Sequence, residues 1–204
     1  TGRALPLGEI EALLQRNTES LVIVDEAYVD FGAESAIELV RRYDNVLVIQ
    51  TFSKSRSLAG MRVGYAIGHQ DLIDGLERVK NSFNSYPLDM LAINSATASL
   101  ADEEYFQQTN QKIIDSREWT AKQLEQLGFI VLPSSTNFLF TQHRFIEGAE
   151  LMGYLRTKNI LVRHFSKPGI DNYLRITIGT QQEMDTLIET LLMLLKQKPL
   201  AVLL

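Results

Sequence analysis

The chain has 204 residues with 45% hydrophobic and 22% charged side chains, ordinary values for a globular protein that buries a core. Its formal net charge of −5 argues against a broad nucleic-acid surface, and no apolar run approaches the roughly 20 residues that a membrane span needs. The absence of cysteine excludes disulfides and thiolate metal sites and fits a reducing compartment, so we expect a cytoplasmic protein.

The first half of the sequence alternates between strand and helix patterns. Short apolar runs rich in β-branched residues at 21–24 and 45–50 predict strands buried on both faces, as in a parallel sheet. Helical spacing at 35–43 completes a strand–helix–strand unit. A third strand at 62–67 follows after a connection too short for a crossover helix, which favours an antiparallel pairing. Helices are also predicted at 7–15, 70–81, 88–100 and 103–127.

From Gly128 onward short strands mix with helices, a pattern typical of a small α+β domain. Thr180 and Glu183 have the spacing of a capping box ahead of the last helix. The pattern therefore predicts a larger α/β domain with a mainly parallel sheet at 1–103 and a smaller α+β domain at 104–204. The later strands are predicted at 129–132, 137–141, 160–164 and 173–178, and the later helices at 147–158 and 181–196.

Two charged residues follow neighbouring strands of the predicted sheet. Asp25 comes directly after the strand at 21–24, and Lys54 follows the strand at 45–50. Ligands bind beyond the carboxyl ends of parallel strands, so we expect both side chains at the same edge. Pyridoxal chemistry uses such a pair, the amine for the cofactor aldehyde and the carboxylate for the pyridine nitrogen. A surface lysine and a salt-bridged aspartate have the same placement, which leaves both interpretations open.

The residues around this pair resemble those of a known enzyme family. Residues 25–28 read Asp-Glu-Ala-Tyr, and they are followed by Ser-Lys at 53–54 and Arg-Val-Gly at 62–64. This combination is similar to the fold-type I pyridoxal-phosphate aminotransferases, and the segment 24–31 is close to their histidinol-phosphate branch. A threonine-phosphate decarboxylase shares the combination, so it indicates the superfamily more sharply than the substrate.

The resemblance extends through essentially the whole chain, from Thr1-Gly2 to the final helix, and implies a chain that is incomplete at its N-terminus. Residues 1–103 would be the last part of the pyridoxal-phosphate-binding large domain, and residues 104–204 the small C-terminal domain. The loop that cups the cofactor phosphate and the residue that stacks on the ring would belong to the missing part. An isolated fragment would then lack part of its site.

The resemblance implies roles toward the cofactor for six residues. Lys54 matches the catalytic lysine that forms a Schiff base with pyridoxal 5'-phosphate and moves the proton. Asp25 matches the partner of the pyridine nitrogen, and Tyr28 matches the tyrosine whose hydroxyl reaches the phenolic oxygen. The positions that match phosphate-holding groups are Thr51, Ser53 and Arg62. Taken one at a time, Tyr28 has the alternative of a core tyrosine, Ser53 that of a turn serine and Arg62 that of a surface ion pair.

Two arginines in the predicted C-terminal domain match substrate-binding positions of the family. Arg175 matches the arginine that binds the substrate carboxylate. Arg163 resembles the arginine that the histidinol-phosphate branch uses for the substrate phosphate, with an exposed strand arginine as the alternative. The three histidines are scattered at surface or strand-end positions without metal-ligand spacing, so we expect no metal site.

The implied function is transamination between histidinol phosphate and 2-oxoglutarate in histidine biosynthesis, with pyridoxal 5'-phosphate as the cofactor and a homodimer as the assembly. Alternatives on the same scaffold are an aromatic aminotransferase, a threonine-phosphate decarboxylase and a non-catalytic ligand-binding module. The expected partners are small-molecule substrates, without nucleic acid or membrane.

Overall fold

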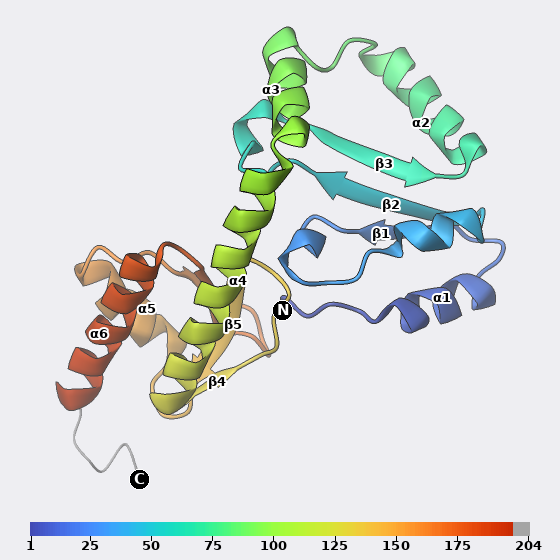
Figure 1. Cartoon of the computed structure of the whole chain (residues 1–204). Coiled ribbons are helices and arrows are strands. Elements are labelled where there is room, and N and C mark those ends of the chain that lie inside the picture. The colour runs from blue at the N-terminus through green and yellow to red at the C-terminus, as the bar shows by residue number, and fades with distance from the viewer. Residues whose placement is uncertain (198–204) are drawn as a thin grey trace. The chain divides into compact units, whose positions relative to one another are not determined.

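The computed structural model describes residues 1–197, which form two compact units (Figure 1). One unit consists of residues 4–110, and the other combines Thr1–Arg3 with the residues from Gln111 onward. The division between the units falls inside helix α4 (Glu103–Gln126). The two domains expected from the sequence, with their boundary a few residues earlier along the chain, stay a prediction.

A three-stranded sheet in the order β1-β2-β3 forms the centre of the unit 4–110 (Figure 1). β1 (Val22–Asp25) pairs in parallel with β2 (Val46–Thr51), as the two apolar runs predict. β3 (Gly64–Gly68) pairs antiparallel with β2, which confirms the orientation expected from the short connection. The carboxyl ends of β1 and β2 and the beginning of β3 therefore lie at the same edge of the sheet.

Helix α1 (Leu7–Arg16) and the 3₁₀ helix η2 (Ala36–Arg41) pack against β1 and β2. The shared core consists of Ile10, Leu14, Ala36, Leu39, Val46 and Val48. The sequence predicts an α-helix at 35–43, but this segment forms a 3₁₀ helix. Its buried residues, Ala36 and Leu39, are one 3₁₀ turn apart, so the tighter helix aligns both with the sheet.

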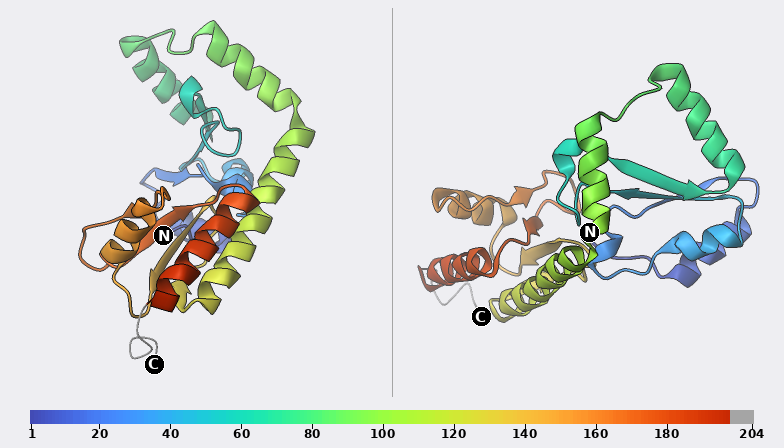
Figure 2. Two further views of the ribbon diagram at one scale, coloured as in Figure 1. Left: turned by 90° about the vertical axis from the view of Figure 1, so that its left-hand side faces the viewer. Right: turned by 45° about the horizontal axis from the view of Figure 1, so that its top comes forward.

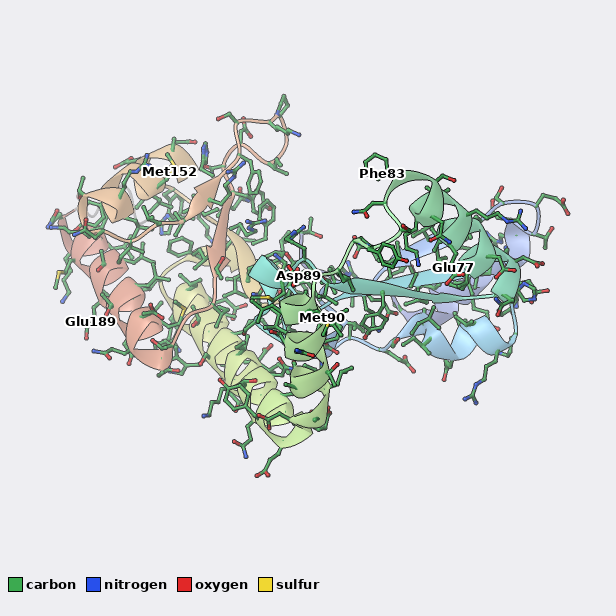
Figure 3. The ribbon with its side chains drawn as sticks, turned by 90° about the horizontal axis from the view of Figure 1, so that it is seen from above. Glu77, Phe83, Asp89, Met90, Met152 and Glu189 are labelled. Carbon is green, nitrogen blue, oxygen red and sulfur yellow. The ribbon has the colours of Figure 1, made fainter. Side chains whose placement is uncertain are left out.

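The unit 4–110 also contains one short helix between two strands of the sheet and two longer helices after the sheet. The 3₁₀ helix η3 (Ala59–Met61) lies in the loop between β2 and β3, and α2 (Gln70–Phe83) and α3 (Met90–Ala101) come after β3. Asp89, labelled in Figure 3, caps α3, because its Oδ1 accepts the N–H of Ala92 at 2.7 Å. Such a cap satisfies a donor at the helix start and defines where α3 begins.

A second sheet, in the order β4-β5-β7-β6 and antiparallel throughout, organises the other unit. Its strands are β4 (Phe129–Val131), β5 (Phe138–His143), β6 (Arg163–His164) and β7 (Leu174–Thr177). β6 is shorter than the predicted strand at 160–164, because only Arg163 and His164 pair with β7.

Helices α5 (Gly148–Thr157) and α6 (Gln181–Gln197) and the later turns of α4 share a core with this sheet (Figure 2). The core includes Leu124, Leu139, Leu151, Leu174, Leu187 and Leu191. The interior side chains thus come from all three helices and from the central strands, which gives this unit its own hydrophobic core.

The capping box predicted at the start of α6 is confirmed. Glu183 Oε2 accepts the backbone N–H of Thr180 at 2.7 Å, and Thr180 Oγ1 accepts the backbone N–H of Glu183 at 3.3 Å. The backbone N–H and the hydroxyl of Thr180 both donate to Glu183 Oε2 and lower the pKa of the Glu183 carboxyl. Within residues 1–197, no helix is both long and apolar enough to cross a membrane.

Candidate active site

Strand pairing places the six predicted cofactor residues at or near one edge of the β1-β2-β3 sheet. Asp25 and Thr51 end the parallel strands β1 and β2, so they lie at the same end. Thr51 pairs with Gly64, the first residue of β3, and Arg62 comes just before it. The other three residues, which follow β1 and β2 closely, are Tyr28, Ser53 and Lys54. The roles of these residues stay a prediction.

Lys54 and Tyr28 come together at this edge. Lys54 Nζ lies 5.6 Å from the centroid of the Tyr28 ring, within range of a cation–π interaction. The Lys54 side chain is exposed, and within residues 1–197 its amine has no hydrogen-bond or ion-pair partner. The N–H of Ser57 donates to the Lys54 carbonyl oxygen at 3.0 Å and closes the turn. The amine is therefore available to react with an aldehyde.

The hydroxyl groups of Thr51 and Ser53, just before Lys54 in the chain, form a hydrogen bond with each other. The Thr51 hydroxyl lies 2.9 Å from Ser53 Oγ and 3.3 Å from the carbonyl oxygen of Val63. Thr51 Oγ1 also accepts the backbone N–H of Ser53 at 3.1 Å. Because both side chains are partly exposed, they can still offer hydrogen bonds to an anion at this edge.

Arg62 has a left-handed backbone conformation, with φ at 57°. This conformation costs a non-glycine residue on the order of 1–2 kcal/mol, and such strain is more frequent at functional sites. Arg62 Nη1 donates to the carbonyl oxygen of Ala59 at 3.0 Å. The N–H of Phe52 donates to the carbonyl oxygen of Val63 at 3.1 Å, which fixes the backbone beside Arg62. The side chain is exposed and can bind an anion.

Asp25 shapes the turn that leads to Tyr28. Its Oδ1 accepts the backbone N–H of Ala27 at 3.0 Å, an interaction that mimics a backbone turn. The side chain is exposed, and its second carboxylate oxygen remains available for another donor.

Glu26, a residue that the sequence interpretation did not single out, is buried beside Asp25, with 7% of its surface exposed. Its Oε2 accepts hydrogen bonds from the Ser35 hydroxyl at 2.7 Å and the Gln50 amide at 2.8 Å, and its Oε1 accepts the N–H of Ala36 at 2.5 Å. Such donors are what a buried carboxylate needs. Glu26 thereby fixes the turn after β1 to η2 and β2. The sequence does place an acidic residue at 26, close to the end of the predicted strand at 21–24. Asp25 has the same placement, so the pattern does not indicate which of the two carboxylates is buried.

The hydrogen-bond network of Glu26 continues to Tyr65 in β3. The Tyr65 hydroxyl donates to Gln50 Oε1, and Gln50 donates to Glu26. Burial raises the pKa of Tyr65, and the carboxylates of Asp30 and Glu26 raise it further. The phenol therefore stays protonated at neutral pH and remains a donor, so the network links β3 and β2 to the turn after β1.

The two predicted substrate arginines lie side by side in the other compact unit. Arg163 in β6 pairs with Arg175 in β7, and paired residues on neighbouring strands project from the same face. The Arg175 guanidinium carbon lies 5.3 Å from the Phe138 ring centroid, and that of Arg163 lies 5.7 Å from the Phe165 ring centroid. Arg163 is exposed and Arg175 is partly buried, so both guanidinium groups have solvent access.

His143 is the last residue of β5, which agrees with the strand-end position expected for the histidines. Its side chain is buried and not on the surface. The N–H of Phe145 donates to its Nδ1 at 3.1 Å, so Nε2 carries the proton and donates to the Leu127 carbonyl oxygen at 3.1 Å. Burial lowers the pKa of His143, consistent with this neutral form. In the described part of the chain, no group of three or more His, Cys, Asp or Glu side chains could hold a metal ion.

The fold is that of the aminotransferases, and the chain belongs to the family of class I and II aminotransferases, which it matches over residues 1–191. This confirms the family predicted from residues 25–28, 53–54 and 62–64.

Among known proteins, the chain is similar to histidinol-phosphate aminotransferases. It is 58% identical to histidinol-phosphate aminotransferase 1 of Hydrogenovibrio crunogenus, over 96% of this chain and 55% of that protein. It is 56% identical to the histidinol-phosphate aminotransferase of Chromohalobacter salexigens, over 94% of this chain and 54% of that protein. The chain thus spans about half the length of the curated relatives it matches.

Solved structures share the fold. The histidinol-phosphate aminotransferase of Sinorhizobium meliloti, solved in complex with pyridoxal-5'-phosphate, has a TM-score of 0.85 at 25% identity and covers 97% of this chain and 55% of its own. The Clostridium acetobutylicum histidinol-phosphate aminotransferase has a TM-score of 0.89 at 22% identity, over 97% of this chain and 61% of its own. The predicted fold class, the α/β fold of the fold-type I transferases, is confirmed.

Proposed function

We propose that this chain carries the lysine, the cofactor-phosphate groups and the substrate arginines of a pyridoxal-phosphate-dependent aminotransferase. The proposed reaction is transamination between histidinol phosphate and 2-oxoglutarate in histidine biosynthesis. The observation that carries the proposal is the exposed Lys54 amine, 5.6 Å from the Tyr28 ring centroid, at the sheet edge where β1 and β2 end. The similarity to histidinol-phosphate aminotransferases supports the choice of substrates. Because the chain spans about half of those relatives, the activity is proposed for the full-length gene product.

The donor set at this edge fits pyridoxal 5'-phosphate. Lys54 provides an amine for its aldehyde, Asp25 provides a carboxylate for its pyridine nitrogen, and Tyr28 provides a hydroxyl for its phenolic oxygen. The phosphate would be held by Thr51, Ser53 and Arg62, which are two hydroxyl groups and one guanidinium group. When bound, the cofactor supplies a ring that withdraws electrons and stabilises negative charge at the substrate α-carbon.

Lys54 is the proposed general base and acid. Its exposed amine, which has no other partner in residues 1–197, can remove the proton from the substrate α-carbon as a base and then, as an acid, donate a proton to a different atom. The Tyr28 ring lies beside this amine and restricts where Lys54 Nζ can move. Asp25 accepts a backbone N–H with one oxygen, and its other oxygen can bind the protonated ring nitrogen.

Arg163 and Arg175 are the proposed anion-binding groups for the substrates. Both substrates carry carboxylate or phosphate groups, and planar guanidinium groups bind these anions with two parallel hydrogen bonds. The pairing of the two arginines on neighbouring strands would allow them to act on one anion or on two anions of the same substrate. Phe138 and Phe165 lie against the guanidinium groups and limit their motion.

We also propose that the protein is a homodimer in the cytoplasm. Strongly exposed apolar side chains lie along α2, α3 and the loop between them, led by Phe83 at 93% and Tyr86 at 90% exposure. Figure 3 shows the Phe83 ring at the end of α2 and Met90 at the start of α3. Exposed apolar patches of this kind mark interaction surfaces. The lack of cysteine fits a reducing compartment.

Product analysis on the full-length gene product tests the proposal. The protein is incubated with pyridoxal phosphate and, in separate reactions, with histidinol phosphate, phenylalanine or O-phosphothreonine, and 2-oxoglutarate is the amino acceptor. We expect fastest glutamate formation with histidinol phosphate and its loss in Lys54→Ala. Preferred use of phenylalanine, or release of carbon dioxide from O-phosphothreonine, would replace the proposed substrate. Unchanged turnover in Lys54→Ala would refute the catalytic role of the lysine.

A further inference from the structure

The lysine loop, defined as residues 52–58, carries Lys54 between β2 and η3. Its first residue, Phe52, is buried in a small core with Val63 and with Ala92 of α3. The N–H of Leu58 donates to the Phe52 carbonyl oxygen at 2.9 Å, so the two ends of the loop are tied together. The loop is therefore a closed turn packed on α3 (Figure 1). It carries the exposed Lys54 side chain.

Arg56 has the most enclosed charged side chain of this loop, with 13% of it exposed. Its guanidinium carbon lies 3.8 Å from the centroid of the Phe106 ring, at the distance of direct stacking. Arg56 Nη1 donates to the carbonyl oxygen of Ser99 at 2.7 Å, and Nη2 lies 3.5 Å from Glu103 Oε2. One side chain thus binds the last turn of α3 and the first turns of α4 at once.

These contacts use both properties of a guanidinium group. The flat face stacks on Phe106, while the edge donates to the Ser99 carbonyl and faces the Glu103 carboxylate. A lysine ammonium is a point charge without a flat face and cannot make both sets of contacts in one position. The site around Arg56 is therefore specific for arginine.

A second contact holds the lysine loop through Ser55, the residue between Lys54 and Arg56. Ser55, with 6% of its surface exposed, donates its hydroxyl to Asp30 Oδ2. Asp30 belongs to the 3₁₀ helix η1 (Val29–Phe31), which begins directly after Tyr28. Ser55 thus links the loop to the segment that presents Tyr28, and Arg56 links it to the α3–α4 junction.

We propose that Arg56 is a positioning residue for Lys54, which anchors the lysine loop to the α3–α4 junction and so keeps Lys54 Nζ beside the Tyr28 ring. The inference rests on the proposed function, in which the Lys54 amine moves the proton. Arg56 itself has no role in the chemistry, because its guanidinium is occupied by Phe106, Ser99 and Glu103. Without the anchor, the Lys54 amine would sample positions from which proton transfer is slow.

The test compares Arg56→Met and Arg56→Lys with Arg78→Met in the full-length gene product. Arg78 is an exposed arginine of α2 in the same compact unit and controls for the loss of one positive charge. The first readout needs no cofactor and is the amide hydrogen exchange of Ser57 and Leu58. We expect roughly tenfold faster exchange in Arg56→Met, the change that ~1.4 kcal/mol of lost local stability produces, and no change in Arg78→Met.

The second readout separates positioning from general stability. We expect kcat to fall about 10- to 100-fold in Arg56→Met with KM nearly unchanged, and a shifted pH profile for trapping of Lys54 by pyridoxal phosphate and borohydride. Arg56→Lys should show a smaller fall in kcat and a smaller shift of the trapping profile than Arg56→Met, without reaching the wild-type values. Wild-type kcat and trapping profile in a folded Arg56→Met protein would overturn the inference, as would full rescue by lysine.

Two further outcomes keep the test decisive. If Arg56→Met does not fold, Phe106→Leu removes the stacking ring from the other side and should give the same faster exchange and lower kcat. Unchanged values in Phe106→Leu would overturn the inference. If wild-type Lys54 is never trapped by pyridoxal phosphate, the proposed function fails, whereas the exchange of Ser57 and Leu58 still reports whether Arg56 anchors the loop.

Discussion

Replacement of Glu26 should destabilise the unit 4–110 more than the replacement of any exposed carboxylate in it. Glu26 is buried, and its two carboxylate oxygens accept hydrogen bonds from Ser35, Ala36 and Gln50 at 2.5 to 2.8 Å. Glu26→Leu removes both acceptor oxygens and all three hydrogen bonds at once, and it leaves the N–H of Ala36 and the Gln50 amide without their partner. Glu26→Gln keeps the shape but turns an NH₂ group toward one of the donors.

The magnitude follows from the number and type of these hydrogen bonds. Each hydrogen bond to a charged group contributes about 1.5–3 kcal/mol, and loss of the buried charge returns part of this total by removing its desolvation cost. We therefore expect Glu26→Leu to lower the free energy of unfolding by about 3–5 kcal/mol. Glu26→Gln should lower it by about 1–2 kcal/mol, because one hydrogen bond is replaced by a repulsive contact.

Urea denaturation followed by circular dichroism measures the global effect, and hydrogen exchange of the Ala36 amide measures the local one. Glu38→Gln, an exposed position on the same 3₁₀ helix, is the matched control and should change stability by less than about 0.5 kcal/mol. If Glu26→Leu unfolds within about 1 kcal/mol of the wild type, or if the Ala36 amide keeps its protection, Glu26 does not fix the turn after β1.

Three further predictions concern separate parts of the chain. Burial lowers the pKa of His143 below its ordinary value of 6.5, so on acidification the unfolded chain binds a proton at this histidine before the folded chain does. The free energy of unfolding should therefore fall as the pH drops below about 6.5. His143→Gln should flatten this dependence in thermal unfolding measured between pH 7.5 and 5. Arg62→Gly should change the free energy of unfolding by less than about 1 kcal/mol, because its φ of 57° suits glycine, yet weaken pyridoxal-phosphate binding at least about tenfold in an absorbance titration. Thr180→Ala should cost about 0.5–2 kcal/mol in urea denaturation by removing the cap of α6, and a loss below about 0.2 kcal/mol would contradict that role.

The strands around the candidate site were predictable because their signals are local. β1 and β2 lie on short apolar runs rich in β-branched residues, and the short connection after β2 indicated the direction of β3. The capping box of α6 was predictable for the same reason, since Thr180 and Glu183 are close in sequence. The shared edge for Asp25 and Lys54 followed from the parallel pairing alone.

The features that escaped prediction depend on contacts between distant segments. Nothing near Glu26 indicates that it, rather than Asp25, is the buried carboxylate, because its partners come from η2 and β2. The sequence around Arg56 is that of an ordinary loop arginine. Its partners, Ser99 of α3 and Phe106 of α4, are distant in sequence, so its partial burial was not predictable. The N–H of Ala36 at the start of η2 likewise donates to Glu26, a contact that helical periodicity cannot reveal.

We propose that Lys54 is the lysine that binds the cofactor, and the site of covalent modification tests this most directly. The full-length gene product is incubated with pyridoxal phosphate, reduced with borohydride and digested, and the modified peptide is located by mass spectrometry. We expect the pyridoxyl group on Lys54, with the wild-type protein modified at that lysine alone and Lys54→Ala left unmodified. Modification at another lysine of the folded protein, or equal modification of Lys54→Ala, would contradict the account.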